Sequence, residues 1–362
     1  MKVKDLVSVI DSFAPFSTQE SYDNSGIQCG DVDATVNKIL VSLDATASVV
    51  DEAIQSGTNT ILTHHPPLFF PIKRIVKGDN EALFKAIVSG INIISAHTNF
   101  DLATNGLNDY FCKLIGIEKI SPIVKSNEKL YKIAVYVPKG YEEKVATALF
   151  EKGAGNTGNY SETSFSIEGT GTFKPLEGSE PFIGTVGRRE TVRETKIETI
   201  VRERNLRKAL SAIKEVHPYE EPAIDVYEIK SDVPDGIGAV GELHEAMSVI
   251  ELANAVKTKT NSSYLRLIGF PQDKVKRVAV CTGSGGSLIK NVENLSVDLF
   301  LTGDLTYHQA LELKERLINT IDIEHFDSEK FFVDAMTEAL SDKVGGIPIV
   351  KSSAMKSPFQ IV

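Results

Sequence analysis

Two adjacent histidines, His64 and His65, lie at a point in the sequence where side chains could bind a metal or transfer protons. They follow the apolar segment 60–63, which is typical of a strand, and the diproline Pro66–Pro67 comes directly after them. The residue before a proline is disfavoured in a helix, and neighbouring residues of a continuing strand point to opposite faces. The pair therefore belongs to a loop just past a strand, where both imidazoles can turn toward one site.

Other imidazoles and carboxylates follow apolar segments of the chain in the same way. Open α/β sheets bind ligands outside the carboxyl ends of their strands, so we expect these side chains to meet at one cleft. The residues in such positions are His97, Asp101, His308, Glu312 and His325. His308 and Glu312 stand four residues apart, so on a helix they share one face.

Three imidazoles and two carboxylates from this set suit Zn, Fe or Mn. The predicted ligands are His64, His65, Asp101, His308 and Glu312. A loop can aim adjacent imidazoles at different ions, and a carboxylate such as Glu312 can bridge two cations about 3.5–4 Å apart. A single loop histidine is more often a solvated or packed residue, so the prediction depends on the whole set. The sequence thus predicts a site for two divalent metal ions.

His97 and His325 are assigned to the chemistry itself, because the five predicted ligands already fill a dinuclear site. A histidine near its usual pKa of about 6.5 can donate or accept a proton at neutral pH. Either residue could instead orient a ligand or cap the end of a strand. Our hypothesis is that both are catalytic and transfer protons near a metal-activated water.

Two further polar features allow more than one interpretation. Asp44 follows a strand, but an aspartate there can equally cap the next helix. The glycine-rich stretch Cys281–Ser287 could bind a phosphate at a helix N-terminus or form a simple turn, and it lacks the GxxxxGK[ST] pattern.

The elements that must position these residues fall into three parts of the chain. Residues 1–125 and 233–362 alternate short β-rich runs with helical patterns, which is typical of an α/β fold. Residues 126–232 show the order β-α-β-β-α-β of a ferredoxin-like α+β domain, and the Pro, Gly and Asp content of 231–238 indicates an exit linker. We predict a discontinuous α/β metal-binding domain made of two halves, with a ferredoxin-like domain inserted between them.

Composition excludes several classes of protein. No apolar stretch approaches the ~20 residues of a membrane span, and Asp5 and Asp11 interrupt an N-terminal helical pattern that would otherwise resemble a signal peptide. A net charge of -10 argues against an extended nucleic-acid footprint. Three widely spaced cysteines give neither a disulfide framework nor a CxxC pattern. We expect a soluble cytoplasmic protein with no membrane or nucleic-acid partner.

Several stretches of both outer parts resemble the family named for the NGG-one-interacting factor, whose bacterial members are known as type 2 homologues of GTP cyclohydrolase I. The matching stretches are "SYDNSGIQCG", "SLDAT", "LTHHPPLF", "AHTNFD", "CTGSGG", "TGDLTYHQALE" and "IEHFDSEKFF". The middle part, with "HPYEEPAIDV" at 217–226, resembles the PII/CutA-like insert of the longer members. One departure is Tyr-Asp-Asn-Ser at 22–25, where the family usually shows Trp-Asp-Asn-Val.

The resemblance implies a dinuclear metal site and a ring-shaped homohexamer. Matched motif by motif, it implies the same five ligands, with Glu312 bridging the two ions. It also implies hydrolysis of a small molecule, such as a nucleotide, as the activity. The alternative is a metal-binding regulatory or interaction protein whose insert senses a ligand or partner.

Overall fold

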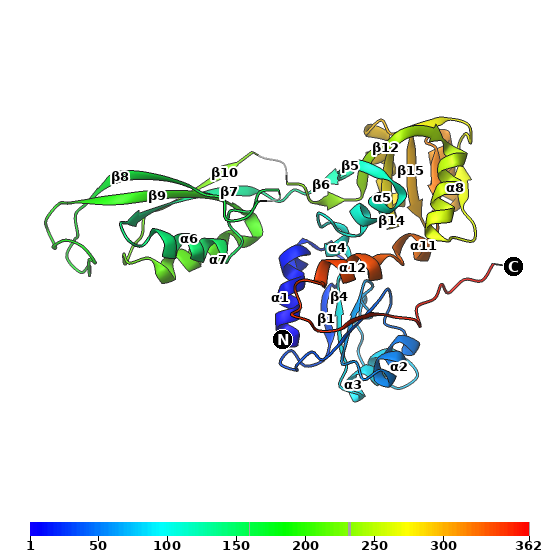
Figure 1. Cartoon of the computed structure of the whole chain (residues 1–362), viewed down its shortest axis with the longest axis horizontal. Helices are drawn as coiled ribbons and strands as arrows, with labels where there is room; N and C mark the ends of the chain where they lie inside the picture. The colour runs from blue at the N-terminus through cyan, green and yellow to red at the C-terminus, as the bar shows by residue number, and fades with distance from the viewer. Residues whose placement is uncertain (159, 231–232, 362) are drawn as a thin grey trace. The chain divides into compact units, whose positions relative to one another are not determined.

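The computed structural model describes residues 1–158, 160–230 and 233–361 (Figure 1). The chain forms two compact units, one of residues 1–126 with 234–362 and the other of residues 127–233. Part of the expected linker 231–238, namely 231–232, lies outside the described residues. Within the rest of it, β11 (Gly236–Ile237) pairs antiparallel with β6 (Val124–Lys125).

The first unit contains a five-stranded sheet that draws strands from both ends of the sequence. Its strands, in spatial order, are β1 (Gly26–Cys29), β4 (Asn92–Ser95), β3 (Thr60–Thr63), β2 (Ile39–Ser42) and β17 (Ile349–Lys351). Strands β17, β2, β3 and β4 are mutually parallel, and β1 runs antiparallel at the edge. The strands β2 to β4 therefore end on the same side of the sheet.

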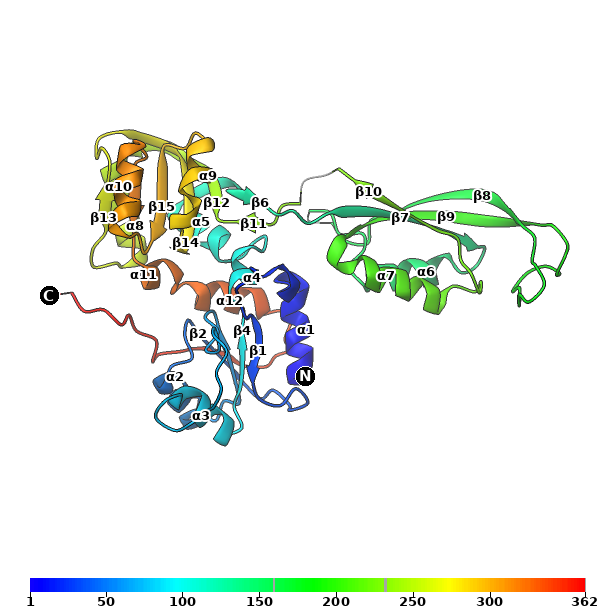
Figure 2. The same cartoon turned by 180° about the vertical axis from the view of Figure 1, so that it is seen from behind.

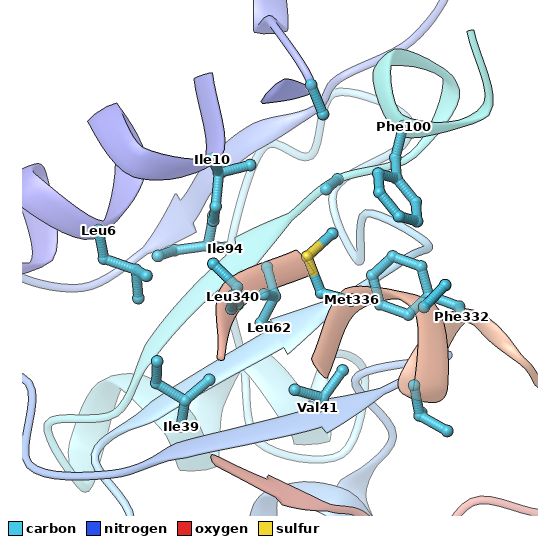
Figure 3. Close-up of a cluster of buried hydrophobic side chains, with 14 of the residues drawn as sticks. Leu6, Ile10, Ile39, Val41, Leu62, Ile94, Phe100, Phe332, Met336 and Leu340 are labelled. Atoms are coloured by element: carbon cyan, nitrogen blue, oxygen red, sulfur yellow. The ribbon is translucent and has the colours of Figure 1, made fainter. Parts of the chain in front are cut away.

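Side chains of this sheet alternate between two helical layers, as the pleat requires. Helices α1 (Val3–Phe13) and α12 (Phe332–Leu340) pack on one face, and α2 (Ala47–Gln55) and α3 (Glu81–Val88) pack on the other. Figure 3 shows the first of these layers, where Phe332 and Met336 of α12 lie close to Leu62 and Phe100. Every central strand is thus buried on both faces, which explains its continuous apolar sequence.

A six-stranded mixed sheet makes up the rest of this unit. Its strands, in spatial order, are β13 (Arg266–Ile268), β16 (Thr320–Asp322), β15 (Leu299–Gly303), β14 (Lys274–Ser284), β12 (Ala239–Ser248) and β5 (Ile117–Ser121). Helices α5 (Leu107–Ile115) and α8 (Val249–Thr260) cover one face. Helices α9 (Ile289–Asn294) and α10 (Tyr307–Glu315) cover the other, as the opposite views of Figures 1 and 2 show. Strands β14, β15 and β16 are parallel and end on the same side.

The second unit has one antiparallel sheet in the order β10-β7-β9-β8 and two helices. Its elements, in chain order, are β7 (Leu130–Pro138), α6 (Glu142–Phe150), β8 (Phe165–Phe173), β9 (Glu190–Arg202), α7 (Glu203–Val216) and β10 (Ile224–Ile229). The chain order is therefore β-α-β-β-α-β. Apolar side chains of both helices pack on β7 and β9, so this unit has a core of its own.

One helix that the sequence pattern predicts as continuous is broken in the structure. The pattern predicts a single helix over 328–340, whereas α11 (His325–Glu329) and α12 are separate. The chain turns sharply before α11, where Glu324 has a φ of 73°. Because α11 is separate from α12, its own side chains face the carboxyl ends of the strands. Among the described residues, no helix has both the length and the apolar character required to cross a membrane.

Candidate metal centre

The strand ends of the two sheets of the first unit meet at a cluster of imidazoles and carboxylates. His64 and His65 directly follow β3, and His97 and Asp101 follow β4 through the short helix α4 (Thr98–Asp101). From the other sheet, α11 brings His325 to a ring-centroid distance of 5.3 Å from His65. This is the side of an open α/β sheet at which ligands bind.

Each histidine of the cluster is held at Nδ1 by an acceptor. Nδ1–H of His64 donates to the carbonyl of Ala96 at 2.9 Å, which leaves Nε2 without a proton in the neutral ring. Carboxylates hold Nδ1 of the other three histidines. The pairs are His65 with Asp44 at 2.8 Å, His97 with Asp23 at 2.8 Å and His325 with Asp304 at 2.7 Å.

This arrangement is typical of metal-binding histidines, which commonly donate their second ring nitrogen to a carboxylate or carbonyl. His64, His65 and His97 form one group whose possible ligand atoms lie within 4.8 Å of one another. His65, His325 and Glu329 form a second such group. The four rings are therefore oriented in advance, in two neighbouring groups that share His65.

The two oxygens of the buried Glu329 face different histidines. Oε1 lies 3.8 Å from Nε2 of His64, while Oε2 lies 2.9 Å from Nε2 of His65 and 2.8 Å from Nε2 of His325. On the far side of His64, Asp101 Oδ1 lies 3.5 Å from the same Nε2. The carboxylate of Glu329, whose two oxygens face different histidines, is placed so that it can bridge two cations.

Two of these buried atoms have no hydrogen-bond partner among the described residues. They are Nε2 of His64 and Oδ1 of Asp101. A buried polar atom without a partner costs about 1–3 kcal/mol, more when it is charged, so groups of such atoms call for an explanation. Direct coordination of a cation would satisfy both at once. The donor set of the cluster thus fits a metal ion.

Close carboxylates set the protonation of the imidazoles in the protein without metal. Burial lowers the pKa of His65, but the nearby Asp44 and Glu329 outweigh burial and raise it to about 10. The pKa of His325 is raised to about 9 for the same reason, by Glu329 and Asp304 against burial. Protons therefore occupy positions that a cation would take, and metal binding must release them.

The two aspartates of the cluster respond differently to burial. Burial raises the pKa of Asp101 to about 7, since its attraction to His64 only partly offsets the loss of hydration. Burial also acts on Asp23, but hydrogen bonds from His97 and Thr98 prevail and hold its pKa well below the ordinary value. Asp23 is thus a permanently charged acceptor for the His97 ring.

The comparisons with known proteins agree with this architecture. The family model described as Duf34/NIF3 (NGG1p interacting factor 3) matches residues 1–358. The chain belongs to the Duf34/NIF3 family. The resemblance drawn from the sequence motifs is therefore confirmed.

Full-length relatives support the same assignment. Proteins from Staphylococcus aureus strain MSSA476 and Bacillus subtilis strain 168, each named GTP cyclohydrolase 1 type 2 homolog, are both 35% identical to this chain. The alignments cover 100% of both chains in the first case, and 98% of this chain and 97% of the relative in the second. A Bacillus cereus protein related to NIF3 has a solved structure with 34% identity and a TM-score of 0.87, covering 100% of this chain and 99% of that one.

The structure does not bring His308 and Glu312, two of the expected ligands, into the cluster. His308 is exposed on the first turn of α10, with its ring against Tyr307. Glu312 instead forms an ion pair with Arg316, at 2.9 Å. The buried residue of α10 is Leu313, so the face shared by His308 and Glu312 turns away from the strand ends. A spacing of four residues places two side chains on one face of a helix, but it does not determine which part of the protein that face contacts.

A second pair with the same spacing, His325 and Glu329, occupies the place expected for His308 and Glu312. Sequence reasoning found His325 but missed Glu329, although the His-x-x-x-Glu pattern of "HFDSE" follows a strand just as "HQALE" does. It also missed Asp23 and Asp304, and it left Asp44 open between a place at the strand ends and a cap of the next helix or turn. No pattern in a single sequence marks an aspartate as the hydrogen-bond acceptor of a histidine ring nitrogen.

The glycine-rich stretch 281–287 makes room for Glu329. A Cβ at Gly283, whose φ is 65°, would collide with Glu329 Oε1, and its N–H donates to Ser328 Oγ at 2.8 Å. The stretch leads into the helix α9 of only six residues. The stretch is therefore the end of β14 followed by the short 3-10 helix Gly286–Leu288, with close packing as the reason for glycine at 283.

Proposed function

We propose that the unit of residues 1–126 and 234–362 binds two divalent transition-metal ions and hydrolyses a nucleotide or a related small molecule. The observation that carries this proposal is the common orientation of four imidazoles, each held at Nδ1 with Nε2 directed into the cluster. A histidine that only packs in a core has no need of a charged acceptor behind it. Zn, Fe and Mn all suit such a donor set.

The residues fit two neighbouring ions that share Glu329. We assign His64, Asp101 and Glu329 Oε1 to one ion, and His65, His325 and Glu329 Oε2 to the other. Nitrogen and oxygen ligands of one ion bonded at about 2.0–2.2 Å lie roughly 3.0–3.4 Å apart. The observed separations of 2.8, 2.9 and 3.3 Å among Glu329, His65 and His325 are close to this spacing. His308 and Glu312 have no part in the assignment.

When bound, such ions polarise a substrate oxygen and lower the pKa of a water molecule to near neutrality. The contribution of the chain is to exclude bulk water around the buried His64 and Glu329 and to move protons. We retain His97 for proton transfer, because its ring lies 5.1 Å from His64 and 5.5 Å from His65 while Asp23 fixes its orientation. The sequence hypothesis gave His325 the same role, but its contacts favour metal binding.

A cavity of about 370 Å³ beside His65 offers space for a substrate. Its lining includes the hydroxyl of Thr46, the amide of Asn80 and the rigid Pro66–Pro67. Such groups can hydrogen-bond a polar ring or a sugar, whereas Asp44, Asp79 and Glu81 in the same lining would repel a phosphate. The names of the relatives make GTP the first substrate to test, with other nucleotides and phosphoesters next.

The test of this function measures metal content and turnover on the same samples. Purified protein, loaded with Zn, Fe or Mn, is screened against GTP, other nucleotides and phosphoesters. Hydrolysis that is lost in Glu329→Gln and retained in Glu312→Gln supports the proposal. Two bound ions without turnover of any substrate would instead favour a regulatory metal-binding protein. Absence of bound metal in the unaltered protein would overturn both.

We also infer a cytoplasmic homohexamer, on the strength of the family resemblance. Light scattering coupled to gel filtration checks the assembly, since a hexamer has six times the chain mass of 39.5 kDa. A monomer or dimer in solution would contradict it.

A further inference from the structure

The unit of residues 127–233 contains a cavity of about 710 Å³, large enough for a small molecule. Strands β7 and β9, the end of β8, the loop that follows it and the turn before β10 contribute its walls. Its lining includes Tyr136, Gly171, Phe173, Lys174, Leu176, Phe182, Glu194, Tyr219, Glu220 and Glu221. All these residues belong to the one unit, so the cavity does not depend on any other part of the chain.

A buried histidine fixes the turn that forms one wall. Nδ1 of His217 accepts the backbone N–H of Tyr219 at 3.1 Å, so Nε2 carries the proton and donates to the carbonyl of Tyr136 at 3.0 Å. Burial lowers the pKa of His217, which keeps this neutral form at physiological pH. The turn and β7 are thereby joined, and the wall exists before any ligand arrives.

Aromatic rings and apolar side chains make up much of the lining. The ring of Tyr219 lies 5.9 Å from that of Phe173 and 6.3 Å from that of Phe182. Phe182 is 50% exposed and Leu176 is 70% exposed, although both line a concave site. The faces of aromatic rings attract cations within about 6 Å.

Carboxylates outnumber basic groups around the same cavity. Glu194, Glu220 and Glu221 line it, against the single basic side chain of Lys174. None of the three carboxylates forms an ion pair in the part of the chain that the structure describes.

Glu194 is the best placed of these carboxylates to meet a ligand. Its Oε1 accepts the hydroxyl of Tyr219 at 2.9 Å, and its Oε2 lies over Gly171, where any Cβ would collide with it. Burial and the neighbouring Glu194 raise the pKa of Tyr219, so the hydroxyl stays protonated and keeps donating. The hydrogen bond holds the carboxylate beside the aromatic rings.

We propose that this cavity binds a small organic cation, with its ammonium group at Glu194 beside Tyr219 and its apolar body against Phe182 and Leu176. An anion would meet three carboxylates, and a neutral apolar ligand would strip them of water without compensation. A cation balances the negative charge of the carboxylates, and the faces of the aromatic rings attract it as well. The proposal does not rest on the metal-dependent function, since no residue of the metal centre takes part.

The test uses the full chain and benzyltrimethylammonium, a cation with an aromatic body that cannot coordinate a metal. Binding is measured by isothermal titration calorimetry and by saturation-transfer NMR. We expect binding of this cation, at least tenfold weaker binding of benzyl alcohol and no binding of benzoate. Glu194→Gln, which retains an acceptor for Tyr219, should weaken binding of the cation about tenfold.

Two controls separate this site from other effects. Glu198→Gln removes a carboxylate of the same strand that is ion-paired to Lys196 and does not line the cavity, so binding should be unchanged. Glu329→Gln should also bind normally, whatever happens to the metals. Phe182→Ala, at a half-exposed position that tolerates truncation, should weaken binding several-fold. No binding up to about 10 mM, or equal binding of the alcohol with no effect of Glu194→Gln, would overturn the proposal.

Discussion

At the scale of single residues, Glu329 and Glu312 form a matched pair, since each follows a histidine by four positions on a helix. We predict that Glu329→Ala loses both metal ions or most of the affinity for them, because both of its oxygens face histidines. Glu312→Ala should retain full occupancy and lose only its ion pair with Arg316. Elemental analysis of the purified variants decides this. Two ions retained in Glu329→Ala would exclude a bridging role.

Metal affinity should rise steeply with pH. His65 and His325 have pKa values of about 10 and 9 without metal, so both are protonated at neutral pH and must lose a proton to ligate. Each proton displaced below its pKa changes the apparent affinity by up to about tenfold per pH unit. Affinity should therefore increase from pH 6, less steeply above about pH 9 where His325 has lost its proton, and level off only above about pH 10. Competition with a chromophoric chelator measures it, and an affinity independent of pH would contradict this protonation scheme.

His97 should be separable from the metal ligands. His97→Ala should keep both ions and lower turnover of the identified substrate by about 10² to 10⁴, the usual contribution of a general acid or base. His325→Ala should lose metal together with activity, because Nε2 of His325 faces Glu329. Parallel metal analysis and kinetics distinguish the two variants. Loss of metal in His97→Ala would make that residue a ligand or its direct support.

At the scale of elements, helix α12 packs against the cluster of imidazoles and carboxylates through Phe332. Phe332 is fully buried, and its ring lies 4.8 Å from that of His64 and 5.6 Å from that of Phe100. Truncation of a buried phenylalanine typically costs about 3–5 kcal/mol. We predict that Phe332→Ala lowers the free energy of unfolding by about this amount, as measured by urea denaturation without metal. Phe332→Leu should cost less, because leucine refills part of the volume; equal costs would mean that the loss comes from the ring contacts with His64 and Phe100 and not from the buried volume.

The positions of most helices and strands around the first sheet were predictable from the sequence, because buried central strands and amphipathic helices leave strong hydrophobic patterns. The N-terminal helix, the strands before His64 and His97 and the helices on both faces of the first sheet occur close to where the patterns place them. The start of α11 at His325 was not predictable, since the chain turns before it at Glu324, which has a φ of 73° although it is not a glycine. This missed start concealed the pairing of His325 with Glu329, because the expected helix began at residue 328 and left His325 outside it.

At the scale of the whole molecule, the unit of residues 127–233 should be removable. The strands that lead into and out of it, β6 and β11, pair with each other, and the N–H of Ser126 donates to the carbonyl of Asp235 at 2.9 Å. A short linker can therefore join residue 126 to residue 234 without strain. We predict that the shortened chain is soluble and binds both metal ions. Gel filtration and elemental analysis check this, and aggregation or metal loss would mean that the excised part completes the core.

The pairing of β17 with β2 has a consequence for synthesis on the ribosome. Ile349 pairs with Ile39, and Ser352 and Ser353 donate hydrogen bonds to Glu52, so the first sheet is completed by residues translated long after its central strands. The contiguous unit of residues 127–233 emerges in between with its core intact and can fold as it leaves the exit tunnel. Until β17 is made, the edge of β2 that it pairs with is unpaired, and an unpaired sheet edge favours aggregation. On the proposed ligand assignment, His65 of the nascent chain cannot yet share an ion with His325, so we expect stable metal loading only after translation of the C-terminal part.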